Sequence, residues 1–236
     1  MKKNILFSLT ALAASSLLAA DPTPKDDITN AAKKLGEKPN YSWRTTIVVP
    51  EDAPFKPGPT DGKTEKEGLT WVGMTFFDNK MQAVVKGNKG ALTDADGAWK
   101  SLEELEKEEG PARFGAMIVR NIKTPAKEAA QLAAAAKELK KVDNLYSGDL
   151  TEEGAAAMQR FGPAGGSGGP TVSDAKGSVK FWIKDGVLTK FQFKVSGTTK
   201  NRDGDDVDID RTTTTEIKDV GTTTITVPDE AKSKLT

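Results

Sequence analysis

The stretch GSVKFWIKDGVLTKFQFKVS, residues 177–196, decides the fold of this chain. Apolar and polar residues alternate on both sides of Asp185-Gly186, a pattern typical of two antiparallel strands joined by a tight turn. Each strand therefore has one apolar side, and that side must be buried against a second layer of structure. The apolar side of the predicted hairpin carries Val179, Phe181, Ile183, Phe191, Phe193 and Val195.

Similar alternation elsewhere in the chain predicts that this hairpin belongs to a large antiparallel sheet. Residues 50–68 contain four prolines and three glycines, and we expect them to form an excursion without regular structure. The other predicted strands are 40–49, 69–77, 81–86, 91–93, 144–150, 205–218 and 222–227.

Helices are predicted near the N-terminus and in the middle of the chain. Asp26 or Asp27 can cap a helix whose apolar residues follow helical spacing up to a stop at Gly36. Residues 101–104, Ser-Leu-Glu-Glu, form a capping box, in which a hydroxyl and a carboxylate satisfy free amide hydrogens at a helix start. Residues 114–121 are expected to form another helical stretch.

The clearest predicted helix is 126–142, which is rich in alanine and has Leu132 and Leu139 two turns apart. A further short helix is expected after Thr151, and residues 162–170, with five glycines, are expected to form a flexible linker. Helices that separate two groups of strands indicate an α+β fold with a large antiparallel sheet.

Composition argues against catalysis. The chain has 236 residues, with 34 basic and 34 acidic side chains, and it contains neither cysteine nor histidine. It therefore lacks disulfides, thiol nucleophiles and thiolate metal sites, as well as the side chain that most often acts as a general base near neutral pH. We expect no enzymatic activity, no cofactor and no metal. A hydrolase based on two carboxylates stays open as a less favoured alternative.

Residues 1–20 have the organisation of a cleavable secretory signal peptide. Lys2 and Lys3 precede an apolar run at 5–18, which is followed by Ala19-Ala20. The run is shorter than the ~20 apolar residues that span a bilayer. We expect cleavage near Ala20, one mature domain at 21–236 and a periplasmic or secreted location. Cleavage removes two lysines and no acid, so the mature charge of −2 does not favour a nucleic-acid partner.

The C-terminal third contains segments in an order that is informative beyond alternation. GSVKFWI at 177–183, a strand at 188–195 and EIKDVG at 216–221 are followed by ITVP at 225–228. These segments resemble the last strands of the LolA/LppX-like superfamily of exported carriers of lipoproteins and acyl lipids. Residues 81–99 and 146–150 fit the same layout.

This resemblance implies a strongly curved antiparallel sheet, an open half-barrel, with helices packed in its concave side and an apolar cavity between the two layers. It implies a lipid or acylated protein as partner and no catalytic residue. Many relatives of the LppX type begin with a lipidated cysteine; this chain has none, so we expect it to be free in solution after cleavage. The candidate cavity residues are Trp43, Trp71, Phe77, Met81, Phe181, Phe191 and Phe193.

Alternatives remain open for these residues. Each candidate side chain is also compatible with an ordinary core behind a sheet. In that case the protein would be a structural or interaction protein on the same scaffold, with exposed edge strands for partners. Trp182 lies opposite Phe181 in the strand and therefore points away from the main apolar face.

The acidic run at 203–210 supplies oxygen atoms of the kind that calcium prefers. In a strand, however, alternate carboxylates lie roughly 7 Å apart per step, which favours a solvated hairpin face over a calcium site. The aspartates of the run are Asp203, Asp205, Asp206, Asp208 and Asp210.

Overall fold

The computed structural model describes residues 22–53, 56–76, 79–159, 172–200 and 204–235. The predicted signal peptide and the glycine-rich linker lie outside the described residues. The strands are β1 (Asn40–Val48), β2 (Thr60–Glu65), β3 (Thr70–Phe76), β4 (Asn79–Lys86), β5 (Lys89–Thr93), β6 (Trp99–Ser101), β7 (Ala136–Val142), β8 (Leu145–Leu150), β9 (Val172–Lys184), β10 (Val187–Lys200) and β11 (Asp206–Lys218). The helices are α1 (Pro24–Gly36), α2 (Leu102–Leu105), α3 (Pro111–Arg120), α4 (Pro125–Ala135), α5 (Glu152–Gln159) and α6 (Asp229–Ser233).

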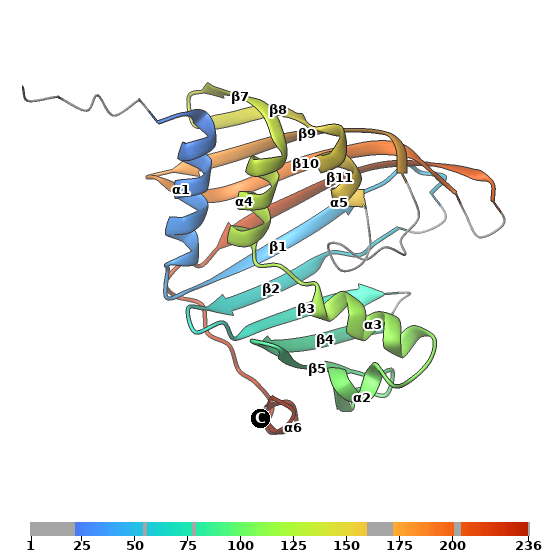
Figure 1. Ribbon diagram of the computed structural model, residues 1–236. Helices are drawn as coiled ribbons and strands as arrows, with labels where there is room; N and C mark the ends of the chain where they lie inside the picture. The colour runs from blue at the N-terminus through green and yellow to red at the C-terminus, as the bar shows by residue number, and fades with distance from the viewer. Residues whose placement is uncertain (1–21, 54–55, 77–78, 160–171, 201–203, 236) are drawn as a thin grey trace, which may run out of the picture.

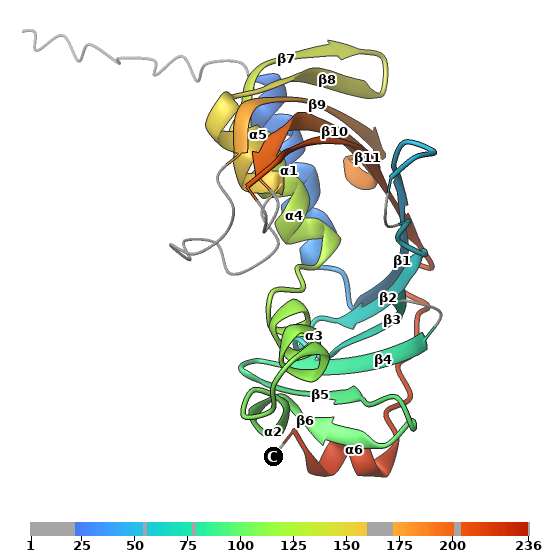
Figure 2. The same ribbon diagram turned by 90° about the vertical axis from the view of Figure 1, so that its right-hand side faces the viewer.

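The described strands form one antiparallel sheet in the order β6-β5-β4-β3-β2-β1-β11-β10-β9-β8-β7 (Figure 1). Its two edges, β6 and β7, do not pair with each other in the described part of the chain, so the sheet does not close into a barrel. Figure 2 shows that the sheet is strongly curved and that α1 to α5 lie on its concave side. The predicted α+β open half-barrel is therefore confirmed.

The hairpin that decides the fold is present and longer than predicted. Strands β9 and β10 pair with Phe181 opposite Phe191, so the two rings lie on the same face. Asp185 and Gly186 both have positive φ, 52° and 72°, as the tight turn between twisted strands requires.

Residues 50–68 are not wholly irregular, because they contain β2. The sequence signal was misleading at Gly62, which indicates a turn by composition but lies within this strand. A Cβ atom built on Gly62 would lie 2.1 Å from the ring of Trp43 on the neighbouring strand. The glycine is therefore required by the close approach of an indole ring.

The predicted helix at 126–142 is wrong in its second half. Helix α4 ends at Ala135, and the following residues form β7, which pairs with β8 up to Val142 opposite Leu145. The residues of β7 have good helix propensity, but pairing with β8 satisfies their backbone groups along one side of the strand. Tertiary context overrides local propensity at this edge of the sheet.

The predicted last strand at 222–227 is also absent. This segment crosses the convex side of the sheet on its way to α6 (Figure 2). Two of its backbone groups form hydrogen bonds with side chains. Thr223 N–H donates to Asn40 Oδ1 at 2.8 Å, and Lys63 Nζ donates to the Thr224 carbonyl at 3.3 Å. Val227 and Ala231 pack against the convex face at β4 and β5.

Helix starts follow their sequence signals with one correction. The capping box at Ser101 and Glu104 is formed as predicted. At α1, however, the cap is Thr23 and not Asp26 or Asp27. The Thr23 side chain accepts from the Asp26 backbone N–H, and the Asp26 side chain accepts from the Thr23 backbone N–H. Pro24 occupies the first helical position.

The core on the concave side has two parts. Helices α1, α4 and α5 cover the half of the sheet formed by β7 to β11 and β1, while α2 and α3 cover β4 and β5. Met74 and Ile122 pack against both clusters, so the apolar layer continues along the concave face.

Candidate functional site

The concave face carries four of the seven predicted cavity residues. Trp43, Phe181, Phe191 and Phe193 belong to one buried cluster, with exposed fractions of 5%, 0%, 0% and 4%. The rings of Phe181 and Phe191 lie with their centroids 6.5 Å apart. Since Phe181 and Phe191 expose no surface, no space that admits a water molecule adjoins them in this conformation.

Two of the other three candidates, Trp71 and Met81, do not belong to this cluster. Trp71 packs on the convex side, beside the C-terminal segment, and its indole N–H donates to Gln82 Oε1 at 3.2 Å. Met81 packs in the second concave cluster, beneath α3. Phe77 lies outside the described residues. That these residues line a ligand cavity stays a prediction.

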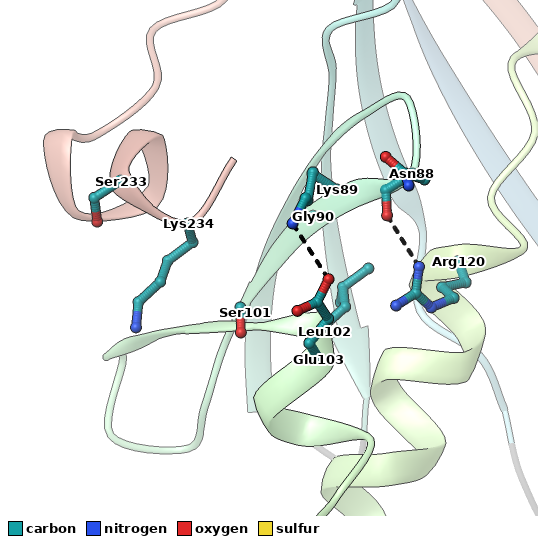
Figure 3. Close-up of a pocket in the computed structure, with 9 residues that line it drawn as sticks. All are labelled: Asn88, Lys89, Gly90, Ser101, Leu102, Glu103, Arg120, Ser233 and Lys234. Atoms are coloured by element: carbon teal, nitrogen blue, oxygen red, sulfur yellow. Dashed lines mark hydrogen bonds and ion pairs between the residues drawn. The ribbon is translucent and has the colours of Figure 1, made fainter. Parts of the chain in front are cut away.

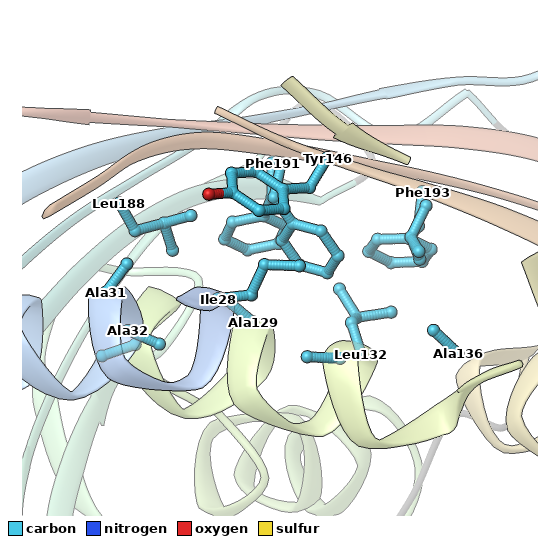
Figure 4. Packing of buried hydrophobic residues seen from close by; sticks show 14 of the residues in the cluster. Ile28, Ala31, Ala32, Ala129, Leu132, Ala136, Tyr146, Leu188, Phe191 and Phe193 are labelled. Carbon is cyan, nitrogen blue, oxygen red and sulfur yellow. The ribbon is translucent and has the colours of Figure 1, made fainter. Parts of the chain in front are cut away.

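The helices that face the aromatic cluster contribute mostly small side chains. Helix α4 buries one large aliphatic residue, Leu132, and α1 buries two, Ile28 and Leu35. Figure 4 shows Leu132 and Ile28 projecting toward the phenylalanine rings of β10. Large residues on the sheet are thus opposed by a thin helical layer. Its buried alanines are Ala31, Ala32, Ala126, Ala129 and Ala133.

A polar contact ties α1 to the sheet at the rim of this layer. The Tyr146 hydroxyl donates to Asp27 Oδ2 at 2.8 Å, and Lys141 Nζ lies 3.3 Å from the same oxygen. The Lys141 ammonium also lies 5.1 Å from the centre of the Tyr146 ring. Hydrogen bonds to Tyr146 and to Asp27 raise the pKa of Lys141.

A second polar cluster lies between α4, α5 and β11. The Arg211 guanidinium donates to the Met158 carbonyl in the last turn of α5. Burial raises the pKa of Glu128 to about 7, although the nearby charges of Lys123 and Arg211 favour its ionised form. Burial likewise lowers the pKa of Arg211, against the attraction of Glu128.

Gln159 completes the polar cluster. It is 4% exposed, and its amide nitrogen donates to the Ser196 carbonyl at 2.9 Å. Its oxygen Oε1 has no hydrogen-bond partner among the described residues. One feature of the sequence could have indicated this cluster. Arg211 is a charged residue on the same side of β11 as the buried residues Thr213 and Thr215, so it needs polar partners there.

The acidic run on β11 faces partners on β10 instead of a common metal site. Asp206 pairs with Lys200 at 2.7 Å and Asp210 with Lys194 at 2.9 Å, while Thr198 donates to Asp208 at 3.2 Å. Asp203 lies outside the described residues. Within the described ranges, no group of three or more acidic side chains is placed to hold a metal ion.

A polar pocket of about 190 Å³ lies at the other end of the sheet, between α6, β5 and α2 (Figure 3). Its cations already have partners: Lys89 pairs with Glu103, Lys234 with Glu104, and Arg120 with Glu106 and the Asn88 carbonyl. The pocket therefore lies at the contact between helix α6 and the sheet, and its charged groups hold these elements together.

None of the described helices is long and apolar enough to cross a membrane. No family model matches the chain, and no curated protein matches it. The solved structures that are similar to it include LprF and LppX. LprF from Mycobacterium bovis is 13% identical, with a TM-score of 0.44, over 88% of this chain and 97% of that one. The lipoprotein LppX from Mycobacterium tuberculosis is 10% identical, with a TM-score of 0.45, over 87% and 99%.

LppX, a member of the superfamily that the sequence resembles, is thus among the similar structures. At these identities the likeness concerns the fold alone.

Proposed function

We propose that the protein is a non-catalytic binding or carrier protein that acts outside the cytoplasm and holds a lipid or acyl chain between the sheet and the helices of the concave side. The observation that carries this proposal is the unequal packing of the two layers. The aromatic rings of the sheet face helices that bury alanines and only a few large side chains.

The energetics of such packing are compatible with entry of an acyl chain. Lifting α1 and α4 from the sheet would expose three large aliphatic side chains, each worth about 1.5–3 kcal/mol of burial. An acyl chain of about a dozen carbons gains on the order of 10 kcal/mol at roughly 0.8 kcal/mol per methylene, before the cost of ordering it. The ligand can therefore offset most of what the helices lose.

A second candidate is an interaction protein with no small ligand. The complete burial of Phe181 and Phe191 favours it, because the protein's own side chains already fill the space against these rings. The two functions differ in whether the helical layer opens, so a measurement at the buried rings separates them.

Tryptophan fluorescence provides that measurement, because the chain has four tryptophans and the concave cluster contains only Trp43. We would replace Trp71, Trp99 and Trp182 by phenylalanine and add a dibrominated stearic acid, whose bromines quench indoles on contact. The carrier function predicts quenching of Trp43. The matched control is the protein with Trp43→Phe and Trp182→Phe, in which Trp71 and Trp99 are kept; it should show little quenching by the fatty acid.

Extraction of the protein from its own cell envelope gives a second readout that does not depend on these variants. A carrier should release bound lipid that mass spectrometry detects. If no lipid is released and Trp43 is not quenched, the carrier function is wrong and the interaction protein is favoured.

A further inference from the structure

An apolar row crosses the convex face near the β7 edge of the sheet. Tyr146 and Phe181 are buried on the concave side, so their strand neighbours Leu145 and Trp182 point to the opposite face. The pairing register places Val142 opposite Leu145, and Leu145 opposite Trp182. Three apolar side chains from β7, β8 and β9 therefore stand side by side.

This row is open to solvent. Val142 is 66% exposed, and Leu145 and Trp182 are partly exposed. On the neighbouring strand β10, Lys190 pairs with Trp182, and its ammonium lies 5.3 Å from the centre of the Trp182 ring. An aromatic side chain on the solvent side of a sheet, next to exposed aliphatic residues, indicates a contact surface.

Lysines flank the row on both sides. Lys140 and Lys180 lie in the adjacent register row, on either side of Ser147, and Lys184 lies beyond Trp182 on the same strand. These three lysines form no ion pair with any residue that the structure describes. The Lys34 ammonium also lies beside Gly186, within 3.0 Å of the position that a Cβ atom would occupy there.

A hollow of about 450 Å³ adjoins the lysine row. It combines three ammonium groups and two hydroxyls with two carboxylates, so it offers donors to a phosphate and acceptors to the hydroxyl groups of a polyol. The side chains at the hollow are Lys137, Glu138, Lys140, Ser147, Asp149, Ser178 and Lys180.

We propose that this convex edge docks on an anionic phospholipid membrane, with Val142, Leu145 and Trp182 at the lipid interface and a glycerophosphate headgroup in the neighbouring hollow. A tryptophan beside aliphatic side chains suits the boundary between headgroups and acyl chains, and lysine ammonium groups reach the headgroup phosphates. Around the apolar row and the hollow, lysines outnumber acidic side chains by five to four: Lys34, Lys137, Lys140, Lys180 and Lys184 against Glu138, Asp143, Asp149 and Asp185.

The docking surface does not depend on the proposed carrier function, because it lies on the opposite face of the sheet. Its test uses residues 21–236, so that the apolar segment at 5–18 does not itself bind lipid. Sedimentation with vesicles of phosphatidylcholine and phosphatidylglycerol is compared with sedimentation with phosphatidylcholine alone. We expect binding to be at least tenfold tighter to the vesicles that contain phosphatidylglycerol.

Two exposed valines supply a matched pair of variants. Val142→Asp should weaken binding at least tenfold, whereas Val48→Asp, at a position 64% exposed at the end of β1, should leave binding unchanged. Lys140→Glu combined with Lys180→Glu should remove the preference for phosphatidylglycerol. In a protein with Trp182 as its single tryptophan, vesicles of brominated phospholipid should quench the tryptophan fluorescence.

The proposal is overturned if the unmodified protein does not bind the anionic vesicles, or if Val48→Asp and Val142→Asp weaken binding equally. Glycerol 3-phosphate at millimolar concentration tests whether the hollow prefers a free phosphate ester. Complete loss of vesicle binding at that concentration would also overturn docking, because the apolar row would then contribute nothing.

Discussion

Replacement of Glu128 by glutamine is expected to stabilise the protein, and to do so more at pH 8 than at pH 5. Glu128 belongs to α4 and interacts electrostatically with Arg211 of β11, and burial raises the pKa of its carboxyl from 4.5 to about 7. The folded protein therefore holds a proton on Glu128 at pH values at which the unfolded chain has released it.

The sign and size of the effect follow from this difference. Between the two pKa values the folded state binds more protons than the unfolded state, so the free energy of unfolding falls as the pH rises. At about 1.36 kcal/mol for each unit of pKa, ionisation of Glu128 costs about 1 kcal/mol at pH 5 and about 3 kcal/mol at pH 8. Glutamine resembles the protonated carboxyl and removes this cost.

Urea unfolding at pH 5 and pH 8, followed by tryptophan fluorescence, measures both values. At pH 8 the gain corresponds to an increase in Tm of about 6–12 °C for a chain of this size. Glu153→Gln, at an exposed position on α5, is the control and should change stability by less than about 0.5 kcal/mol. A loss of stability in Glu128→Gln at pH 8 would refute the reasoning, because attraction to Arg211 would then outweigh burial.

Further predictions concern packing. Gly62→Ala should cost about 1–3 kcal/mol in urea unfolding and change the Trp43 fluorescence, because the added methyl group meets the indole ring. Phe191→Ala should cost about 3–5 kcal/mol by the same assay. Gly36→Cys with Ala126→Cys should form a disulfide on oxidation, since the Cβ positions lie 3.5 Å apart, and should raise stability by up to about 4–5 kcal/mol relative to the reduced protein.

Sequence patterns predicted the sheet well where one side of a strand is apolar. The hairpin of β9 and β10 is the clearest case, because alternation shows which residues share a face and Asp185-Gly186 places the turn. The sequence patterns failed at Gly62, where the glycine indicated a loop. The residue lies in a strand and must be glycine because the indole ring of Trp43 lies against it. The patterns failed again at 136–142, where helix propensity did not reveal that β8 would offer a pairing edge.

The candidate site could be predicted only in part. Alternation groups residues within a strand but does not tell which face of the sheet each group joins, so Trp71 was assigned to the concave side although it packs on the convex one. The partners of Arg211 come from α4 and α5, which are distant in sequence, and no local pattern brings them together. The polar cluster around Arg211 therefore could not be predicted from the sequence.

The attachments of the helical layer bear on the proposed carrier function, which requires this layer to open. Helix α1 is held at its first turn by the bond from Tyr146 to Asp27, and α5 is held at its last turn by the bond from Arg211 to Met158. Such bonds contribute only about 0.5–1.5 kcal/mol each, or somewhat more with a charged partner, because water replaces them when they break. Between these polar ends the helices bury mainly alanine. The layer thus seals the aromatic rings against water, and the proposed function requires an apolar chain to displace it against these polar bonds and the burial of Ile28, Leu35 and Leu132.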